Sequence, residues 1–335
     1  PVEIPLGAMR FNSDSQKLEY WNGEIWMQVH TFSPNLDGGT RGVMAGGHPN
    51  NDTIDYITIS TTGNATDFGN LTDATQYSAG CSSNTRGLIM GGAHPARVDI
   101  IEYVTISQPS NATDFGNLTA TTAHNAGWSN QTRGLSMAGS TPSKVNTVNY
   151  VTIASTGNAN DFGDINNTVY VGSGTGNSTR GIHYGGAEPG QPAGLNVIDY
   201  TNIATTGNFE DFGDTSDGVF DDMGGASNGI TAIMALCGAD ADLQKRCESI
   251  RPSTLGNSIE FGDLTTIRAW SNGNNQLCSS TRGCIGGGRV QPGGSNTDVI
   301  DYFTFATQGD AVDFGDQSTA RAAYSTFSNG HGGLG

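Results

Sequence analysis

The sequence is poor in basic residues and has no long apolar run. It contains 15 Lys and Arg against 32 Asp and Glu, which gives a formal net charge of −17. Because phosphate backbones are bound through lysine and arginine, this deficit argues against nucleic acid as a partner, and it also disfavours anionic membrane surfaces. No stretch approaches the length of a membrane span, and no N-terminal segment resembles a signal peptide. We therefore expect that the chain folds in a cytoplasm and does not insert into a membrane.

The sequence also lacks a recognisable set of catalytic or metal-binding residues. No Ser/His/Asp or Cys/His arrangement is arguable, and the six histidines follow no metal spacing. Aspartate pairs such as Asp161 with Asp164 would allow a calcium site, but surface turns rich in aspartate are the commoner explanation. We interpret five irregularly spaced cysteines as reduced, packed thiols: Cys81, Cys237, Cys247, Cys278 and Cys284. The sequence thus predicts a protein that is not an enzyme and has no metal and no cofactor.

What the sequence has in abundance is glycine, in a phrase that recurs six times. There are 49 glycines, and the phrase runs Thr-Arg-Gly, Gly-Gly, Ile-Asp-Tyr-x-Thr-Ile and Asp-Phe-Gly. A period of about 50 residues built from short strand-like runs and turns is typical of a propeller or solenoid. Successive phenylalanines of the last element are 47, 47, 50, 49 and 53 residues apart: Phe68, Phe115, Phe162, Phe212, Phe261 and Phe314.

A single repeat reads as four antiparallel strands. In the copy at residues 72–118, the pattern predicts strands at 72–82, 85–90, 100–106 and 114–118. No segment shows helical periodicity. Four strands per repeat is the count of a propeller blade, so we predict an all-β chain with a closed β-propeller.

The repeated residues have structural roles in this interpretation. We expect the phenylalanines to pack between blades. An arginine that recurs at one blade position is expected to bond neighbouring backbone carbonyls or the repeated aspartate, and an anion-binding ring is the alternative. These arginines are Arg41, Arg86, Arg133, Arg180 and Arg282.

The repeat count predicts six blades, with a short module at the N-terminus. Residues 319–330 match the first strand of a repeat, so the two chain ends are expected to share a blade and leave no open edge. Residues 30–39 are the alternative source of that strand, in which case a seventh blade forms. The predicted domains are residues 1–32 and 33–335.

The fifth repeat departs from the consensus. Ser227-Asn228-Gly229 is interpreted as its degenerate form of Thr-Arg-Gly, and Cys247-Glu248-Ser249 stands where Ile-Asp-Tyr should be. Its variable stretch, residues 238–252, gathers three cations, Lys245, Arg246 and Arg251. Both neutral drift and specialisation explain such a copy.

The leader has a different composition. Residues 7–26 read as three short strands with turns at residues 12–15 and at Asn22-Gly23, a strong hairpin signal. Exposed Tyr20, Trp21 and Trp26 would suit an assembly interface. The alternative is a hairpin that covers one face of the propeller.

Two of these phrases resemble known families. Gly-Gly followed by a recurring tyrosine looks like a kelch blade, but the tryptophan that kelch blades carry is missing, so the resemblance is to a kelch-like group. The phrase TRG…GG…IDY.TI..TGNA.DFG.LT is similar to repeats in structural proteins of marine tailed bacteriophages, especially those of cyanobacteria. The leader phrase G.MRFNSDS.KLEYWNG..W resembles a module of tail fibres and virion appendages.

The resemblance implies a virion structural protein: a tail fibre, head fibre or decoration protein made in the host cytoplasm. Residues 1–30 would contact other virion proteins, with several copies on the particle. Loops of variable length after the second strands would face outward for host recognition, with a host-surface glycan as a candidate partner. They are residues 48–53, 93–98, 140–146, 187–196, 239–246 and 289–298.

Two other functions compete with this one. The first is a carbohydrate-binding, lectin-like propeller. The second is a propeller enzyme such as a galactose-oxidase relative, which needs a copper site of tyrosine, histidine and cysteine that the spacing does not supply.

Overall fold

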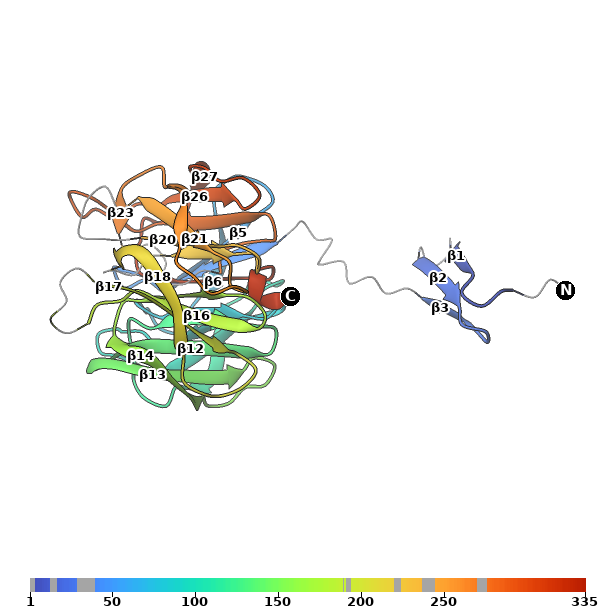
Figure 1. Ribbon diagram of the computed structural model, residues 1–335, viewed down its shortest axis with the longest axis horizontal. Coiled ribbons are helices and arrows are strands. Elements are labelled where there is room, and N and C mark those ends of the chain that lie inside the picture. The colour runs from blue at the N-terminus through green and yellow to red at the C-terminus, as the bar shows by residue number, and fades with distance from the viewer. Residues whose placement is uncertain are drawn as a thin grey trace. The chain divides into compact units, whose positions relative to one another are not determined.

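The chain forms two units built almost wholly of strands. The structure, a computed structural model, describes residues 4–12, 17–28, 40–188, 190, 194–219, 224–236, 245–269 and 276–335. Residues 1–38 form one compact unit, and residues 39–335 form the other (Figure 1). The predicted boundary between residues 32 and 33 lies outside the described residues.

The N-terminal unit is a three-stranded antiparallel sheet in the order β1 (Met9–Asn12), β2 (Lys17–Trp21) and β3 (Trp26–Gln28). Trp21 pairs with Trp26 across a four-residue connection, which is longer than the predicted Asn22-Gly23 turn. The side-chain oxygen of Asn22 accepts the amides of Glu24 at 3.0 Å and Ile25 at 2.8 Å. This asparagine therefore organises the turn through its side chain. The predicted turn at residues 12–15 lies largely outside the described residues.

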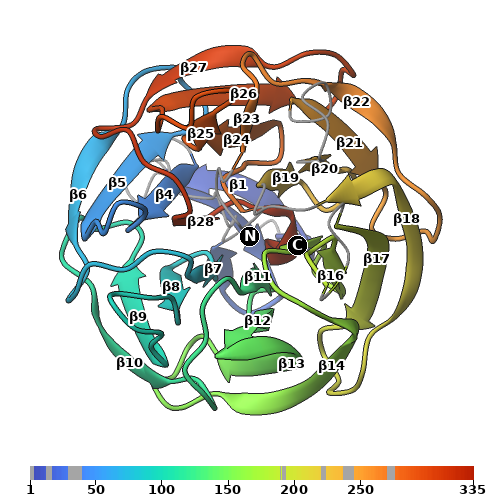
Figure 2. The same ribbon diagram turned by 90° about the vertical axis from the view of Figure 1, so that its left-hand side faces the viewer.

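The second unit is a six-bladed β-propeller, as the repeat predicts. Its antiparallel sheets surround a common axis, and each runs from an inner strand to an outer strand (Figure 2). Blades 2, 3 and 4 each follow the chain strand by strand. Their strands are, in blade 2, β7 (Ala79–Ser82), β8 (Arg86–Met90), β9 (Ile100–Thr105) and β10 (Thr113–Asn117); in blade 3, β11 (Ala126–Ser129), β12 (Arg133–Thr141), β13 (Ser143–Thr152) and β14 (Asn160–Val169); and in blade 4, β15 (Ser173–Gly176), β16 (Arg180–Tyr184), β17 (Leu195–Asn202) and β18 (Glu210–Val219).

Blades 5 and 6 follow the same plan with local differences. Blade 5 consists of β19 (Gly225–Ser227), β20 (Ala232–Ala235), β21 (Arg246–Ile250) and β22 (Ile259–Asp263). Blade 6 consists of β24 (Arg282–Gly286), β26 (Val299–Thr304) and β27 (Val312–Asp316), beside the short pair β23 (Arg268–Ala269) and β25 (Arg289–Val290). Its inner position is taken by residues 277–279, since the amide of Cys284 bonds the carbonyl of Leu277 at 2.9 Å.

Blade 1 joins the two ends of the propeller. It is formed by β28 (Ser325–Ser328), β4 (Arg41–Ala45), β5 (Thr53–Thr58) and β6 (Thr66–Asn70). The last strand of the chain supplies the inner position, with Ser325 opposite Ala45 and Ser328 opposite Gly42. The shared blade is therefore confirmed, and the alternative of a seventh blade is wrong. Closure leaves no unpaired sheet edge between the first and last repeats.

The predicted first strand at residues 72–82 is wrong over most of its length, because only Ala79–Ser82 is a strand. Tyr77 has a φ of 60°, which is incompatible with an extended strand. Its amide bonds the carbonyl of Ala323 in blade 1 at 2.9 Å. Tyr77 thus hydrogen-bonds to the neighbouring blade, whereas Gln76 forms an isolated bridge with Ala93 of its own blade.

A ring of side-chain caps joins the outer strands. In every blade the side chain before the fourth strand accepts the amide of a residue in the preceding blade's outer strand at 3.1 Å. Because each cap crosses a blade junction, the set ties all six blades together. The caps are Asn64, Asn111, Asn158, Asn208, Asn257 and Asp310.

Candidate functional site

The recurring arginines lie at the blade junctions. Each guanidinium lies over the tyrosine of its own blade, with its carbon 4.4–4.8 Å from the ring centroid. It also donates to a backbone carbonyl of the next blade at 2.8–3.3 Å. The tyrosine in turn meets the buried phenylalanine edge-on, at 5.9–6.1 Å between centroids. We call this arrangement the Arg–Tyr–Phe stack. Its members are Arg41, Tyr56 and Phe68; Arg86, Tyr103 and Phe115; Arg133, Tyr150 and Phe162; Arg180, Tyr200 and Phe212; and Arg282, Tyr302 and Phe314.

The acidic residues of the repeats are also engaged between blades. The carboxylate of Asp301 accepts the amide of Thr265 at 3.1 Å and its hydroxyl at 2.7 Å. Asp301 also pairs with the buried Arg268 at 2.8 Å. Equivalent polar side chains accept from the preceding blade in the same way: Asp55, Glu102, Asn149, Asp199 and Glu248. Burial raises the pKa of Glu102 and of Asp199. These groups hold the blades together, and they do not form a catalytic pair.

The C-terminus closes one end of the propeller axis. A short 3₁₀ turn, η2 (Gly332–Leu334), follows the buried His331. The Nε2 of His331 lies 3.1 Å from the carbonyl oxygen of Ser82, and its ring meets Trp128 at 5.3 Å. Burial lowers the pKa of His331 to about 4. A neutral imidazole is therefore packed against the inner strands of blades 2 and 3.

The described cysteines are buried and form no disulfide. They are Cys81, Cys247, Cys278 and Cys284, and burial raises the pKa of each thiol. Cys237 lies outside the described residues. In the part of the chain that the structure describes, no three His, Cys, Asp or Glu side chains gather as metal ligands. Asp161 lies in β14 at a bulge opposite Asn149, and its carboxylate accepts the amide of Gly163 at 3.3 Å.

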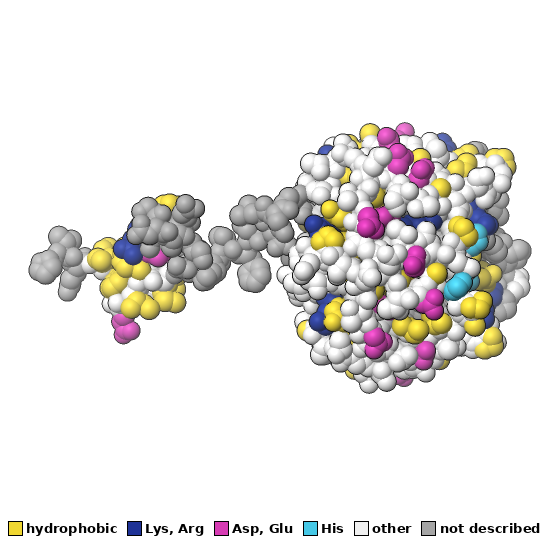
Figure 3. All heavy atoms as spheres, turned by 180° about the vertical axis from the view of Figure 1, so that it is seen from behind, with side chains coloured by type: hydrophobic (Ala, Val, Ile, Leu, Met, Phe, Trp, Pro, Cys, Tyr) yellow, Lys and Arg dark blue, Asp and Glu magenta, His cyan; other side chains and the backbone are white. Residues whose placement is uncertain are grey.

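The N-terminal sheet has one face that is entirely apolar. Met9 lies opposite Tyr20, and Tyr20 lies opposite Met27, so their side chains share a face. Phe11 lies opposite Leu18 on the same face. The exposed fractions of these side chains are 62% for Met9, 67% for Phe11, 40% for Leu18, 39% for Tyr20 and 37% for Met27. We call these five residues the apolar face. Apolar side chains cover much of the N-terminal unit on the side that Figure 3 shows.

The two tryptophans predicted for an assembly interface lie on the opposite face. Trp21 and Trp26 pack against each other at 5.6 Å, and Arg10 lies 4.2 Å above the ring of Trp26. Arg10 also pairs with Glu19 at 2.8 Å. Trp21 and Trp26 are thus half-buried within their own sheet, whereas Tyr20 belongs to the apolar face. The alternation of apolar residues along the leader was the signal that could have revealed this face.

Blade 5 lacks the Arg–Tyr–Phe stack. Its register places Met234 opposite Glu248, as Ile89 lies opposite Glu102 in blade 2. The arginine position is therefore Thr231, and the predicted equivalent at residues 227–229 is wrong because Ser227 ends the inner strand β19. The tyrosine position is Ser249, as the sequence indicates.

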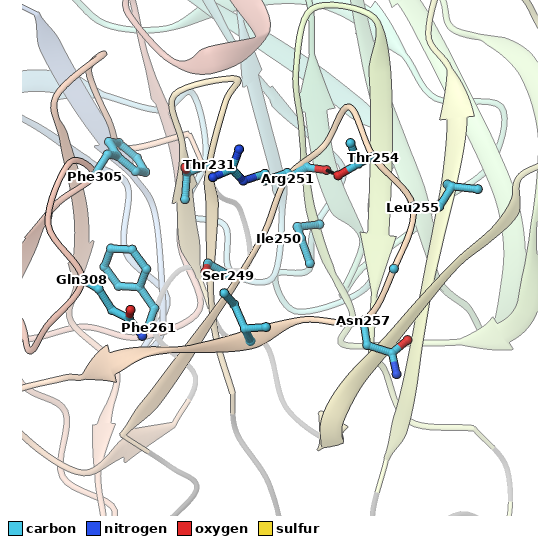
Figure 4. A pocket seen from close by; sticks show the side chains of 12 residues that line it. Thr231, Ser249, Ile250, Arg251, Thr254, Leu255, Asn257, Phe261, Phe305 and Gln308 are labelled. Carbon is cyan, nitrogen blue, oxygen red and sulfur yellow. Dashed lines mark hydrogen bonds between the residues drawn. The ribbon is translucent and has the colours of Figure 1, made fainter.

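A pocket lies where the stack is missing. It has a volume of about 340 Å³ between blades 5 and 6 (Figure 4). We call it the blade-5 pocket. Its lining includes Thr231, Ser249, Arg251, Asn257, Phe261, Phe305 and Gln308. The loss of two large side chains explains the space.

The variable loops occupy equivalent positions in their blades. His48 bridges Ala322, and Ala93 bridges Gln76, so each loop begins beside the segment that precedes an inner strand. Residues 189, 191–193 and 239–244 of two of these loops lie outside the described residues. The loops that are described therefore lie at the same end of the ring.

Comparisons with known proteins identify no relative. No protein-family model matches the chain, and none of the curated proteins matches it. In the described residues, no helix is long and apolar enough to cross a membrane. The apolar face and the blade-5 pocket are therefore the features of the molecule that bear on its function.

Proposed function

We propose that this protein is a structural component of a tailed-bacteriophage virion, a tail fibre, head fibre or decoration protein. The N-terminal unit attaches it to the particle, and the propeller is displayed for assembly or for contact with the host surface. The proposal rests on the resemblance of the repeat and leader phrases and on one structural observation, the apolar face.

The apolar face needs a partner to become buried. A three-stranded sheet has too little material to cover such a face by itself. Met9, Phe11, Leu18, Tyr20 and Met27 together present aromatic and methionine side chains, which are enriched in the centres of protein interfaces. The opposite face, with Arg10, Glu19 and the two tryptophans, satisfies its own polar groups. The sheet is therefore suited to attachment through one side.

The propeller suits display because its repeated residues are committed to holding it rigid. Arginine stacks, carboxylate bonds and side-chain caps all cross blade junctions. A scaffold of this kind leaves its loops to vary without loss of the fold.

Purified particles provide the test of this proposal. Virions isolated from an infected host by density gradient should contain the chain at a fixed copy number, measured by quantitative mass spectrometry. A chain that is expressed during infection but is absent from washed particles would contradict the proposal.

A second candidate function, glycan binding, is favoured by the blade-5 pocket. Two phenylalanine rings, hydroxyls and amides line it. Such a mixture of apolar surface and a few polar groups is typical of small-ligand sites.

A further inference from the structure

The five intact stacks define what the blade-5 pocket has lost. In the junction between blades 1 and 2, Arg41 lies over Tyr56 and donates to the carbonyl of Ile106 at 2.8 Å. The carbonyl at the equivalent position of blade 6 belongs to Phe305. In the described part of the chain no side chain donates to it, because Thr231 replaces the arginine. The pocket is thus the volume of an arginine and a tyrosine, left open at one junction of six.

What remains in the blade-5 pocket is suited to a polar ring. Phe261 keeps its place from the stack, and Phe305 replaces the aliphatic or proline side chain of other blades. Asn257 uses its side-chain oxygen to accept the amide of Asp214, which leaves its NH₂ group to offer. Gln308 donates to the carbonyl of Glu260 at 2.6 Å, which leaves its oxygen as an acceptor.

The rim of the pocket is apolar and exposed. Leu255 and Ile259 line it and are 56% and 67% exposed. Clustered apolar exposure on an otherwise polar propeller surface is expected at a binding site.

The charge of the pocket is the opposite of that of the protein. Arg251 lines it, and no aspartate or glutamate does, although the net charge of the chain is −17. Continuing the register of β20 and β21 places Arg251 opposite Thr231, and Figure 4 shows its side chain extended toward Thr231.

Two of the three cations of the variable stretch at residues 238–252 have acidic partners. Lys245 pairs with Asp263 at 2.8 Å, and Arg246 pairs with Glu248 at 3.2 Å. Of the lysine and arginine side chains that the structure describes, Arg251 alone has no hydrogen bond, ion pair or ring contact. An unpaired guanidinium presents a fork of donors that matches a carboxylate.

We propose that the blade-5 pocket binds an acidic pyranose, such as a uronic acid residue of a surface glycan. Arg251 binds the sugar carboxylate, and the apolar face of the sugar ring packs on Phe261 and Phe305. The hydroxyls of Thr231 and Ser249 and the amides of Asn257 and Gln308 bind the ring hydroxyls. This inference deepens the second candidate function, and it does not depend on attachment to a virion.

The test uses the full-length chain in solution without particles, so its result is independent of virion incorporation. Sodium glucuronate, glucose and sodium acetate are titrated separately by isothermal calorimetry, with saturation-transfer NMR to detect weak binding. We expect glucuronate to bind roughly 10-fold or more tightly than glucose, since a bond to a charged group contributes about 1.5–3 kcal/mol. Acetate, which lacks the ring, should bind more weakly than glucuronate.

Two variants locate the binding in the pocket. Thr231→Arg with Ser249→Tyr restores the consensus stack and should abolish glucuronate binding by filling the space. Arg251→Thr with Thr105→Arg moves the arginine to the matching position of blade 2 at constant net charge, where Arg86 and Tyr103 already fill the junction. That variant should also lose the binding.

Several results would overturn the proposal. They are equal affinity for glucuronate and glucose, equal affinity for acetate and glucuronate, or unchanged binding in either folded double variant. Unchanged binding in the relocated-arginine variant would show a charge effect without a pocket. Should the refilled variant fail to fold, the relocated-arginine variant decides alone.

Discussion

At the scale of single residues, the molecule is held together by polar and cationic side chains that cross blade junctions. Arg86 illustrates the pattern, because it lies over Tyr103 at 4.4 Å and donates to the carbonyl of Ile153 at 2.9 Å. A single side chain thereby connects an aromatic ring of one blade with the backbone of the next. Such residues are structural, although a row of arginines resembles a binding surface.

The first prediction concerns this arginine. Arg86→Ala should lower the free energy of unfolding by about 1–3 kcal/mol, because it removes a cation–π contact and leaves a carbonyl without its charged donor. Arg251→Ala is the matched control, since Arg251 has no partner, and it should change stability by less than about 0.5 kcal/mol. Denaturant unfolding of both variants measures the difference. Equal effects would show that the stack contributes nothing beyond an ordinary surface arginine.

The second prediction concerns pH. Burial lowers the pKa of His331 to about 4, below its ordinary value of 6.5. Between these values the unfolded chain binds a proton that the folded chain does not, so stability falls as pH falls through this window. His331→Gln lacks this titration, so the stability advantage of the native protein over the variant should shrink between pH 7 and about pH 4.5.

Melting temperatures measured across this range check the prediction. His183, which burial also shifts to a pKa of about 4, titrates in both proteins. The raised pKa values of Glu102 and Asp199 act in the opposite direction in both proteins as well. A difference between the two proteins that is independent of pH would contradict a buried neutral His331.

The sequence predicted some of these residues and missed others for physical reasons. The spacing of the arginines and phenylalanines was visible because each blade repeats the same contacts. Thr231 could not be aligned from sequence alone, because the insertion-prone loops of blade 5 obscure the register that pairing with β21 fixes. The unpaired state of Arg251 depends on where Asp263 and Glu248 lie, which only the folded sheet reveals.

At the scale of strands, propensity and periodicity gave the second, third and fourth strands of blade 2 closely. They lie at Arg86–Met90, Ile100–Thr105 and Thr113–Asn117, within one residue of the pattern. The predicted inner strand was too long, because Tyr77 has a φ of 60° and its amide bonds the carbonyl of Ala323 in the neighbouring blade. In β1 to β3, successive side chains point to opposite faces of the sheet, as the alternation in the sequence indicates. One of these two faces is the apolar face.

The third prediction concerns β28. Deleting residues 319–335 removes the inner strand of blade 1 and leaves β4 with an open edge. We expect aggregation or a large fall in melting temperature, because the first and last repeats no longer share a sheet. A soluble deletion variant with an unchanged melting temperature would show that the ring does not depend on this closure.

At the scale of the whole molecule, the chain combines a rigid ring with a small sheet whose apolar face is exposed. The two units differ in this respect: contacts between blades stabilise the propeller, whereas the N-terminal sheet has five exposed apolar side chains on one face. The proposed function follows this difference: the N-terminal sheet would attach the protein, and the propeller would be displayed.

The fourth prediction separates the two units. A chain that begins at residue 39 should fold as a propeller and remain monomeric in analytical ultracentrifugation, because few large apolar side chains are exposed in the described part of the ring: Ile100, Ile230, Leu255, Ile259 and Val312. Circular dichroism should show less than about one-fifth helix, since no repeat has helical periodicity. A truncated chain that fails to fold would mean that residues 1–38 are part of the propeller's stability.

The most direct test is incorporation of an apolar-face variant into particles. Phe11→Ser with Tyr20→Ser makes this face polar, and Val312→Ser, an equally simple change at a 54% exposed propeller residue, is the control. Each variant is supplied during infection in place of the native chain, and its copy number in purified virions is measured by mass spectrometry. The account predicts that the control is incorporated as the native chain is, and that the double variant is folded but absent from particles. Normal incorporation of the double variant would contradict attachment through the apolar face.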